Sequence, residues 1–572
     1  MPEKFLKVYN LLLVGSTGAG KSTFINSISN FFLYETLKDA LADTLPSIHN
    51  LFCGLEILVE NQNQSLMPGV DRTDHQNERF KSTASSCTLE PRVYSFSCKG
   101  IEFNIIDVPG LADTGGLAQD RINKQAIIRQ IGRFEELHGI CIVVSAAVNK
   151  LTTEFKFCLN EVLSCLNKSA IENLMFVVTN CAGHQFTPGF VAETIKEYID
   201  ELNRIRSLSI DFDSNVFCID NEAFRFIIGW NQSSEFRQAH ENKISTYEES
   251  WKMSREAVFD LFKRLYTMNV HRTKDTMSVA RASTVIQCII PSLSVVMGRI
   301  AVADTKEYKK KMLDSLMGNG TMEKPDVQVQ DQESPQLVCT HKACLKKSID
   351  PKTNRVFFDF SNPCHENCQI KGVAKAGLGD PALRQCQKID MEDNCRTCSH
   401  NYKHHMHVPY RVTKTTSKVD TGTNNPFTRE EAEKRYDLFI KSLKQENAAI
   451  LGETIKLAKF LKINAIIEYN TAFEERLQVE ITTEEANGNT DAVKNLESNI
   501  KEYKQKMSLI KVSEDNRFND VEVADVEKSL EKLFTLPLYG KTIQNLYKKE
   551  LPPSEAADPH EFIKCRVKYI PD

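Results

Sequence analysis

Residues 14–23 read VGSTGAGKST, and this stretch decides the fold of the first part of the chain. A mostly apolar run, 8–14, precedes it, and residues 24–28 continue it with apolar side chains at helical spacing. In the pattern G-x-x-x-x-G-K-[ST], between a strand and a helix, glycines let the backbone curl around a phosphate. The loop N–H groups and the first helical turn then point at that phosphate. The sequence therefore predicts a phosphate-binding loop rather than a chance match.

Each residue of this loop is a candidate ligand of a nucleotide. Lys21 is expected to reach the β- and γ-phosphates and to act in catalysis, and the Ser22 hydroxyl is expected to bind Mg²⁺. The predicted cofactor-binding residues of the loop are Gly15, Ser16, Thr17, Gly18, Ala19, Gly20, Lys21, Ser22 and Thr23.

The composition is typical of a globular protein with several domains. The chain has 572 residues, of which 41% are hydrophobic and 26% charged. A net charge of −4 gives no global reason to expect nucleic acid or an anionic membrane as partner. The apolar stretch 283–303 contains Gln287, Pro291 and Arg299, which favours a buried helix over a membrane span. Seventeen cysteines without a secretory signal indicate a reducing, cytoplasmic location.

A second motif ends a predicted β-hairpin. Two apolar runs, 91–96 and 101–106, are separated by a short turn at 98–100, which requires an antiparallel pair. The second run is followed by Asp107-Val108-Pro109-Gly110. An Asp at the end of a strand beside the phosphate loop can hold Mg²⁺, and the Gly110 N–H can contact a γ-phosphate. Asp107 and Gly110 are therefore predicted site residues.

The motifs resemble those of the GTPase superclass, and within it the septin-like and immunity-associated nucleotide-binding GTPases. The resemblance depends on GSTGAGKST, on the Thr88 loop before PRVYSF, and on DVPGLADTGG, and it covers roughly residues 5–230. It implies GTP or GDP with Mg²⁺ as ligand, and it makes Thr88 the threonine that closes on Mg²⁺. Thr83 is a rival for that role. Alternating short apolar strands and helices independently predict an α/β, three-layer P-loop domain with a mainly parallel sheet over 1–235.

Leu111 departs from the common GTPase pattern, which has a glutamine that orients the attacking water. A leucine side chain cannot hold water, so slow hydrolysis is expected, or hydrolysis completed by another group. The septin-like relatives share a non-glutamine residue there, and dimerisation completes or regulates the site in several of them. A homodimer through this domain is therefore one expectation.

The base-binding region also departs from the pattern. Thr179 and Asn180 end an apolar strand and are predicted to contact the nucleotide, but 181–183 lack the aspartate that accepts hydrogen bonds from guanine. Guanine selectivity is therefore implied by the resemblance, and ATP stays an alternative. At the end of the last strand, Asn221 or Glu222 can contact the base, and capping of a helix by Asp220 is the plainer interpretation.

The remainder of the chain is predicted as five further segments. They are a helical extension at 236–317, a linker at 318–336, a Cys/His-rich module at 337–410, a second linker at 411–425, and a helical hairpin with a tail at 426–572. The hairpin helices are expected to run to about residue 479 and from 491 to 510, around a break at 487–489. A further helix is expected at 521–534, with an irregular tail after 552. The hairpin is either packed internally or a surface for self-association.

The Cys/His-rich module holds seven of the seventeen cysteines and six of the thirteen histidines. Their paired spacings suit zinc better than a cluster of free thiols, and a structural role suits them better than a catalytic one. Seven cysteines and one histidine complete two sites. The simplest partition is Cys339, Cys344, Cys364 and Cys368 for one site, and Cys386, Cys395 and Cys398 with His405 or His400 for the other. Interleaved pairing and His365 as a ligand are equally open.

The sequence thus predicts a GTP-binding switch protein with slow or dimerisation-dependent hydrolysis. A nucleotide-binding scaffold with little turnover is the alternative that Leu111 favours, and an ATPase is the alternative that the missing aspartate favours. No element that reads nucleic acid stands out, and the protein partners are not indicated.

Overall fold

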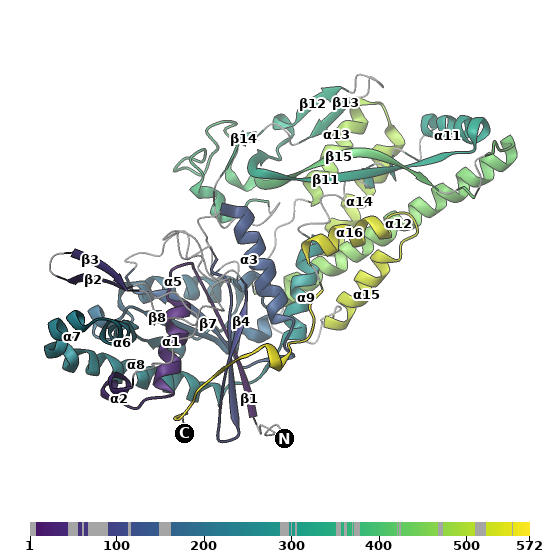
Figure 1. The fold of residues 1–572 in the computed structure, drawn as a ribbon. Coiled ribbons are helices and arrows are strands. Elements are labelled where there is room, and N and C mark those ends of the chain that lie inside the picture. The colour runs from purple at the N-terminus through teal and green to yellow at the C-terminus, as the bar shows by residue number, and fades with distance from the viewer. Residues whose placement is uncertain are drawn as a thin grey trace. The chain divides into compact units, whose positions relative to one another are not determined.

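A computed structural model gives the fold (Figure 1). The described residues are 7–43, 55–59, 62–66, 90–111, 116–147, 159, 162–286, 297–298, 300–301, 303, 306–349, 356–359, 363–368, 370, 378–419, 421–422, 425–466, 473–508, 522–551 and 553–571. The chain divides into two units. The first unit comprises 1–277 with 554–572, and the second comprises 278–553.

A seven-stranded sheet forms the centre of the first unit, in the order β16-β4-β5-β1-β7-β8-β9. These strands are β1 Lys7–Gly15, β4 Arg92–Cys98, β5 Ile101–Asp107, β7 Gly139–Ser145, β8 Leu174–Thr179, β9 Val216–Cys218 and β16 Ile563–Cys565. Strands β5, β1, β7, β8 and β9 are parallel, and β4 pairs antiparallel with β5 across a turn at 99–100. The predicted mainly parallel sheet and its hairpin are confirmed.

Helices cover both faces of this sheet. They are α1 Lys21–Phe31, α2 Leu37–Ala42, α3 Gly116–Ile131, α5 Gly189–Arg206, α6 Glu222–Gln232, α7 Ser234–His240, α8 Ile244–Leu265 and α9 Thr273–Thr284, which continues into the second unit. Two small antiparallel pairs accompany them, β2 Leu55–Val59 with β3 Gln62–Leu66, and β6 Glu136–Leu137 with β10 His271–Arg272. On β1, Leu11 to Val14 are fully buried although successive side chains point to opposite faces, so neither face is open to water.

The first unit extends beyond the predicted boundary at residue 235. The buried face of α8, with Trp251, Leu261 and Phe262, belongs to the same hydrophobic cluster as Leu11 and Leu13 of β1. This apolar face has to be covered by the sheet, so α8 is part of the first unit's sheet-and-helix fold rather than of a separate helical extension.

The tail after residue 552 is not irregular throughout, contrary to the prediction. Residues 563–565 form β16, which pairs parallel with β4 at the edge of the sheet. The Lys568 and Tyr569 N–H groups both donate to the Phe32 carbonyl, at 2.8 and 2.7 Å. A three-residue strand carries too little pattern to be read from sequence, because its partner supplies the pairing.

The second unit combines a long β-ribbon, the Cys/His-rich module and a helical group. Its strands are β11 Met322–Cys339, β12 Lys346–Ile349, β13 Val356–Asp359, β14 Pro363–His365 and β15 His405–Val419. Its helices are α11 Lys306–Asn319, α12 Arg429–Asn464, α13 Phe473–Ala486, α14 Thr490–Ser508, α15 Val523–Phe534 and α16 Gly540–Glu550.

Most of each segment predicted as a linker lies in a strand, 322–336 in β11 and 411–419 in β15, so the prediction was wrong. Residues 322–331 of β11 pair antiparallel with 410–419 of β15, from Met322 opposite Val419 to Asp331 opposite Tyr410. The polar composition of both segments is typical of a loop, whereas the ribbon obtains its hydrogen bonds from a partner far along the chain. The β-branched residues at 412, 413, 415 and 416 and the alternation of valine and glutamine at 327–330 were local signals of a strand.

In the helical group, one predicted helix boundary was wrong and the predicted break between two helices is confirmed. The helix predicted to reach about residue 479 ends at Asn464, and α13 begins at Phe473. The predicted break at 487–489 is present, with Gly488 at φ 73°, and α13 packs against α14 across it. Among the described residues, no helix combines the length and apolar character required to cross a membrane.

Candidate nucleotide site and candidate metal centre

The phosphate loop has the backbone that its glycines allow. Strand β1 ends at Gly15, and helix α1 begins at Lys21. Gly18 and Gly20 have φ of 81° and 92°, in the left-handed region that side chains disfavour. The loop therefore curls between strand and helix, and the N-terminus of α1 opens onto it.

Lys21 lies at the mouth of this loop and is buried, with 6% of its surface exposed. Its Nζ donates to the carbonyl oxygens of Gly15 and Ser16, at 3.2 Å each. These bonds hold the ammonium group against the loop, beside Ser22 in the first turn of α1. The sequence-predicted cation and hydroxyl are thus brought together at one end of the sheet.

Asp107 is fully buried at the carboxyl end of β5. In the parallel pairing with β1 it stands opposite Leu13, two residues before the loop begins. Beyond it the chain stays beside the loop, because the Leu111 N–H donates to the Gly15 carbonyl and the Thr17 N–H donates to the Leu111 carbonyl. The two predicted motifs are therefore adjacent in space.

Gly110 is in contact with the phosphate loop. A β-carbon at this position would lie 2.6 Å from Thr17 Oγ1 and 2.8 Å from the Thr17 Cα and backbone nitrogen. The Gly110 carbonyl accepts a hydrogen bond of 2.8 Å from Nδ2 of Asn123 in α3. Glycine is thus required by space rather than by φ, and Asn123 holds the segment in place, a role that sequence reasoning missed.

The Leu111 side chain is 1% exposed. It packs in the interior, so it presents no polar group to the loop. The structure therefore agrees with the sequence analysis: Leu111, which stands where the common GTPase pattern has a glutamine, cannot orient water.

Thr179 supports the phosphate loop from inside the fold and does not lie on the exposed surface of the site. It is fully buried, and its hydroxyl donates to the carbonyl oxygen of Ala19 at 2.8 Å. Asn180 is exposed, with φ of 59°, and its Nδ2 donates to Ser145 Oγ at 2.6 Å. Of the two predicted residues, Asn180 is therefore the one on the open side of the loop.

Asp220 connects the two loops predicted to lie near the nucleotide base, one at 180–183 and the other at 220–222. Its carboxylate accepts from the Ala182 N–H at 2.9 Å and from the Glu222 N–H at 2.8 Å. Asn221 is buried and accepts from the Ser27 hydroxyl at 2.8 Å. Burial, followed by the neighbouring Asp220 charge, raises the pKa of half-buried Glu222. The interpretation of Asp220 as a helix cap is correct in part. Its carboxylate accepts from the first N–H of α6, that of Glu222, but the N-cap residue is Asn221.

Thr83 and Thr88, the two candidates for the threonine that closes on Mg²⁺, lie outside the described residues. All other predicted residues of the phosphate loop and of the Asp107 motif are described.

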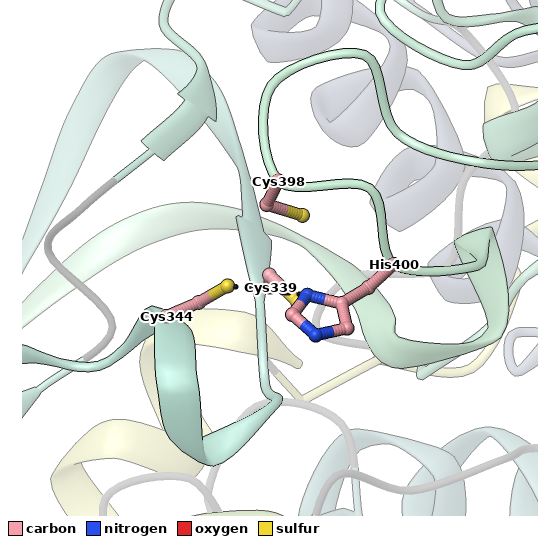
Figure 2. A group of neighbouring side chains, drawn as sticks. All are labelled: Cys339, Cys344, Cys398 and His400. Atoms are coloured by element: carbon pink, nitrogen blue, oxygen red, sulfur yellow. Dashed lines mark hydrogen bonds between the residues drawn. The ribbon is translucent and has the colours of Figure 1, made fainter.

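In the second unit, all seven cysteines of the Cys/His-rich module lie in groups with the geometry of metal ligands. The first group is Cys339, Cys344, Cys398 and His400, the second is Cys364, Cys395, Cys398 and His405, and the third is His365, Cys368 and Cys386. Within each group the candidate ligand atoms lie within 4.8 Å of one another. Figure 2 shows the side chains of the first group turned toward one another.

This grouping corrects the simplest partition of the ligands and agrees with interleaved pairing. Cys339 and Cys344 lie with Cys398 rather than with Cys364 and Cys368. The β-ribbon is the reason, because its register sets Cys339 opposite His405 and so brings 339–344 beside 395–405. His400 and His405 each belong to a group, and His365, the open alternative, belongs to the third.

His405 has the tautomer that a metal ligand needs. Its Nδ1 is 3.0 Å from the Asn401 carbonyl oxygen, which can only accept, so Nδ1 carries the proton. The lone pair of Nε2 then faces Cys398 Sγ at 3.3 Å. Burial lowers the pKa of His405 to about 4, so the ring is neutral at pH 7. A backbone carbonyl on the second nitrogen is the usual support of a metal-binding histidine.

The core of this module consists largely of cysteine. Its buried cluster contains the four apolar side chains Leu337, Leu383, Ile389 and Tyr402 together with Cys339, Cys364, Cys368, Cys386 and Cys395. Among the described residues, this cluster thus has fewer buried apolar side chains than cysteines, and a bound metal would add stabilisation to it.

One segment of the chain matches a protein-family model. A model described as "Domain of unknown function (DUF8206)" matches residues 331–411, which include all seven cysteines of the module. No curated protein is significantly similar to the chain.

Several solved structures show a weak likeness to part of the chain. Toc33 from Arabidopsis thaliana, in complex with Mg²⁺ and GMPPNP, is 17% identical over 46% of this chain and 87% of its own, with a TM-score of 0.25. Toc33 in complex with GDP and Mg²⁺ is 16% identical over 46% and 88%, with a TM-score of 0.24. The G domain of the T. maritima FeoB iron transporter is 15% identical over 42% and 98%, with a TM-score of 0.18.

Proposed function

We propose that the first unit binds a guanine nucleotide with Mg²⁺ and acts as a switch that hydrolyses GTP slowly, alone or on dimerisation. One observation carries the proposal: a curled glycine loop with Lys21 at its mouth lies beside buried Asp107 and is touched by Gly110. A cation, a carboxylate and a backbone N–H thus meet at the carboxyl edge of a parallel sheet, where ligands bind in such folds.

The residues of this site suit a nucleotide with its metal. Lys21 and the loop N–H groups would hold the β- and γ-phosphates, and the Gly110 N–H would contact the γ-phosphate. The hydroxyl of Ser22 and the carboxylate of Asp107 are oxygen donors of the kind that Mg²⁺ prefers, and Thr88 or Thr83 would add a second hydroxyl. Bound Mg²⁺ neutralises the charge of the phosphates. Because Gly110 touches the phosphate loop, a γ-phosphate bound there would shift the position of the segment after Asp107.

The guanine preference is supported by the resemblance to the septin-like and immunity-associated GTPases. Slow hydrolysis is supported by Leu111, whose buried side chain cannot orient water. The same observation favours a second candidate function, a nucleotide-binding scaffold with little turnover. Exposed Asn180, at the open side of the loop, is the residue we expect to contact the base or ribose.

For the second unit we propose structural zinc held by the Cys/His-rich module. The seven cysteines and three histidines supply the soft and imidazole ligands that zinc prefers. Thiolate ligands require a reducing compartment, so we place the protein in the cytoplasm.

The nucleotide part is tested with a fluorescent GTP analogue and the full chain. Binding is expected only with Mg²⁺, and unlabelled GTP is expected to compete better than ATP. Lys21→Ala removes a charge-assisted hydrogen bond, so affinity should fall by roughly 10- to 200-fold. Lys38→Ala, which changes an exposed lysine of α2, is the control. Unchanged affinity in Lys21→Ala would contradict the proposal, and equal competition by ATP would remove its guanine part.

Single-turnover hydrolysis separates the switch from the scaffold. If dimerisation completes the site, the rate constant should rise with protein concentration. If bound GTP stays intact at every concentration while binding remains Mg²⁺-dependent, the scaffold is the correct function.

A further inference from the structure

Cys398 belongs to two of the three groups of candidate metal ligands. Its sulfur lies within reach of Cys339, Cys344 and His400, and also within reach of Cys364, Cys395 and His405. On the basis of the zinc part of the proposed function, we propose that the Cys398 thiolate bridges two zinc ions. A third ion is held separately by His365, Cys368 and Cys386, which supply three ligands among the described residues and leave its fourth position to a ligand outside this group, so that the chain binds three ions.

Ligand numbers favour a shared sulfur. A structural zinc ion takes four ligands. Without Cys398 each of the first two groups has three ligands, and with Cys398 assigned to only one group the other stays incomplete. A thiolate has more than one lone pair and can donate to two ions at once. Sharing therefore completes both sites with the seven side chains that the fold brings together.

The distances within each group agree with those between ligands around one ion. With Zn–S of about 2.3 Å and Zn–N of about 2.0 Å, tetrahedral geometry separates neighbouring ligand atoms by roughly 3.5–3.8 Å. In the first group, His400 Nδ1 lies 3.3 Å from Cys344 Sγ and 3.7 Å from Cys339 Sγ. In the second, His405 Nε2 lies 3.3 Å from Cys398 Sγ. In the third, the Cys368 and Cys386 sulfurs are 3.8 Å apart.

A tight turn sets Cys398 between the two groups. Ser399 has φ of 62°, its N–H donates to the Cys395 carbonyl at 2.6 Å, and the Cys395 N–H donates to the His400 carbonyl at 2.8 Å. The Thr397 hydroxyl donates to the Cys364 carbonyl at 2.9 Å, which joins the turn to the chain segment that carries Cys364. The turn thus presents Cys395 and His400 to different groups, with Cys398 between them.

The third group is a separate ion site. Among the described residues it contains His365, Cys368 and Cys386, and none of these belongs to the first two groups. His365 Nδ1 lies 3.2 Å from Cys386 Sγ, while its other nitrogen faces the Gln387 side chain at 3.0 Å. Substitutions here should therefore leave the bridged pair intact.

The test is the zinc content of the full chain after competition with a chelator, measured by native mass spectrometry and elemental analysis. The unchanged protein should retain three ions. Cys398→Ala should lose two ions, whereas Cys339→Ala, Cys395→Ala and Cys368→Ala should each lose one, from the first, second and third groups. Loss of a single ion from Cys398→Ala would overturn the bridge.

A measurement without substitutions covers the case in which the variants do not fold. After exchange with ¹¹³Cd, two of the three cadmium resonances should show scalar coupling to each other through the shared sulfur. Uncoupled resonances would overturn the bridge and leave structural metal in place. A chain that retains no zinc or cadmium would instead overturn the zinc part of the proposed function together with the bridge.

Discussion

Gly110 is the residue at which the two nucleotide motifs touch. In Gly110→Ala the new β-carbon would meet the Thr17 backbone, which cannot rotate away, so the segment after Asp107 has to move. We expect a loss of about 1–3 kcal/mol in stability and a reduced preference for GTP over GDP. Binding titrations with both nucleotides and thermal unfolding followed by tryptophan fluorescence check this.

Gly183→Ala is the matched control, because a β-carbon there has nothing within 4 Å. The fluorescence reports on the first unit alone, since both tryptophans of the chain, Trp230 and Trp251, lie in it. Equal effects of the two substitutions would show that the contact with Thr17 is unimportant.

His271 links the stability of the first unit to pH. It is 2% exposed, and Nε2 pairs with the Thr276 hydroxyl at 2.8 Å. Burial lowers its pKa to about 4, against roughly 6.5 in an unfolded chain. As the pH falls below about 6.5 the unfolded state takes the proton first, so stability falls until the pH reaches about 4.

Between pH 7 and pH 5 this histidine should account for a loss of about 2 kcal/mol. His271→Gln should flatten that part of the pH dependence, whereas His560→Gln, at an exposed histidine of the same unit, should not. Urea unfolding monitored by tryptophan fluorescence at both pH values is the measurement. Identical slopes for the unchanged protein and His271→Gln would contradict the assignment.

At the scale of the elements, the start of α16 depends on a side chain from α12. Glu446 is 2% exposed and accepts hydrogen bonds from the Leu538 and Tyr539 N–H groups, at 2.5 and 3.0 Å. Glu446→Ala would leave two buried donors unpaired, so a loss of about 2–3 kcal/mol is expected.

Hydrogen exchange of α16 measures this effect locally. Glu430→Ala, on the exposed face of the same helix, should change the protection of α16 by much less. If α16 is protected from exchange equally in both variants, the hydrogen bonds that Glu446 accepts do not stabilise the start of that helix.

The elements also show what local pattern can predict. The strand–loop–helix at residue 15 and the β4–β5 hairpin were predicted because each is specified within about twenty neighbouring residues. Strands β11 and β15 were missed because they join distant parts of the chain: Asp326 pairs with Thr415, and its carboxylate accepts a hydrogen bond from the Ser417 hydroxyl, 91 positions away. Short alternating runs such as Val327-Gln328-Val329-Gln330 were present, but the polar composition of the segment and its prolines, Pro325 and Pro335, favoured a linker.

At the scale of the whole molecule, the two ends of the chain make one unit. Strand β16 lies at the edge of the sheet, and the Tyr266 hydroxyl donates to the Pro571 carbonyl at 3.0 Å. Removal of residues 554–572 should therefore lower the unfolding temperature of the first unit and expose the edge of β4. Tryptophan fluorescence during heating measures the effect.

Addition of a peptide of residues 554–572 should restore part of the lost stability, and a peptide with Lys564→Pro should restore less, because proline removes a donor from the ladder. A truncated chain that unfolds at the original temperature would show that the tail is dispensable.

Local sequence was enough to predict the phosphate loop, the Asp107 motif, the hairpin between them and the seven cysteines of the candidate metal centre. Each of these features is recognised from particular residue types a few positions apart, so neighbouring residues are enough to predict it. Only the tertiary structure decided that Thr179 supports the loop, that Cys398 stands between two ligand groups, and that Lys564 pairs with Ser95, 469 positions away. These features depend on contacts between distant segments, which packing of the whole chain selects and no local pattern encodes.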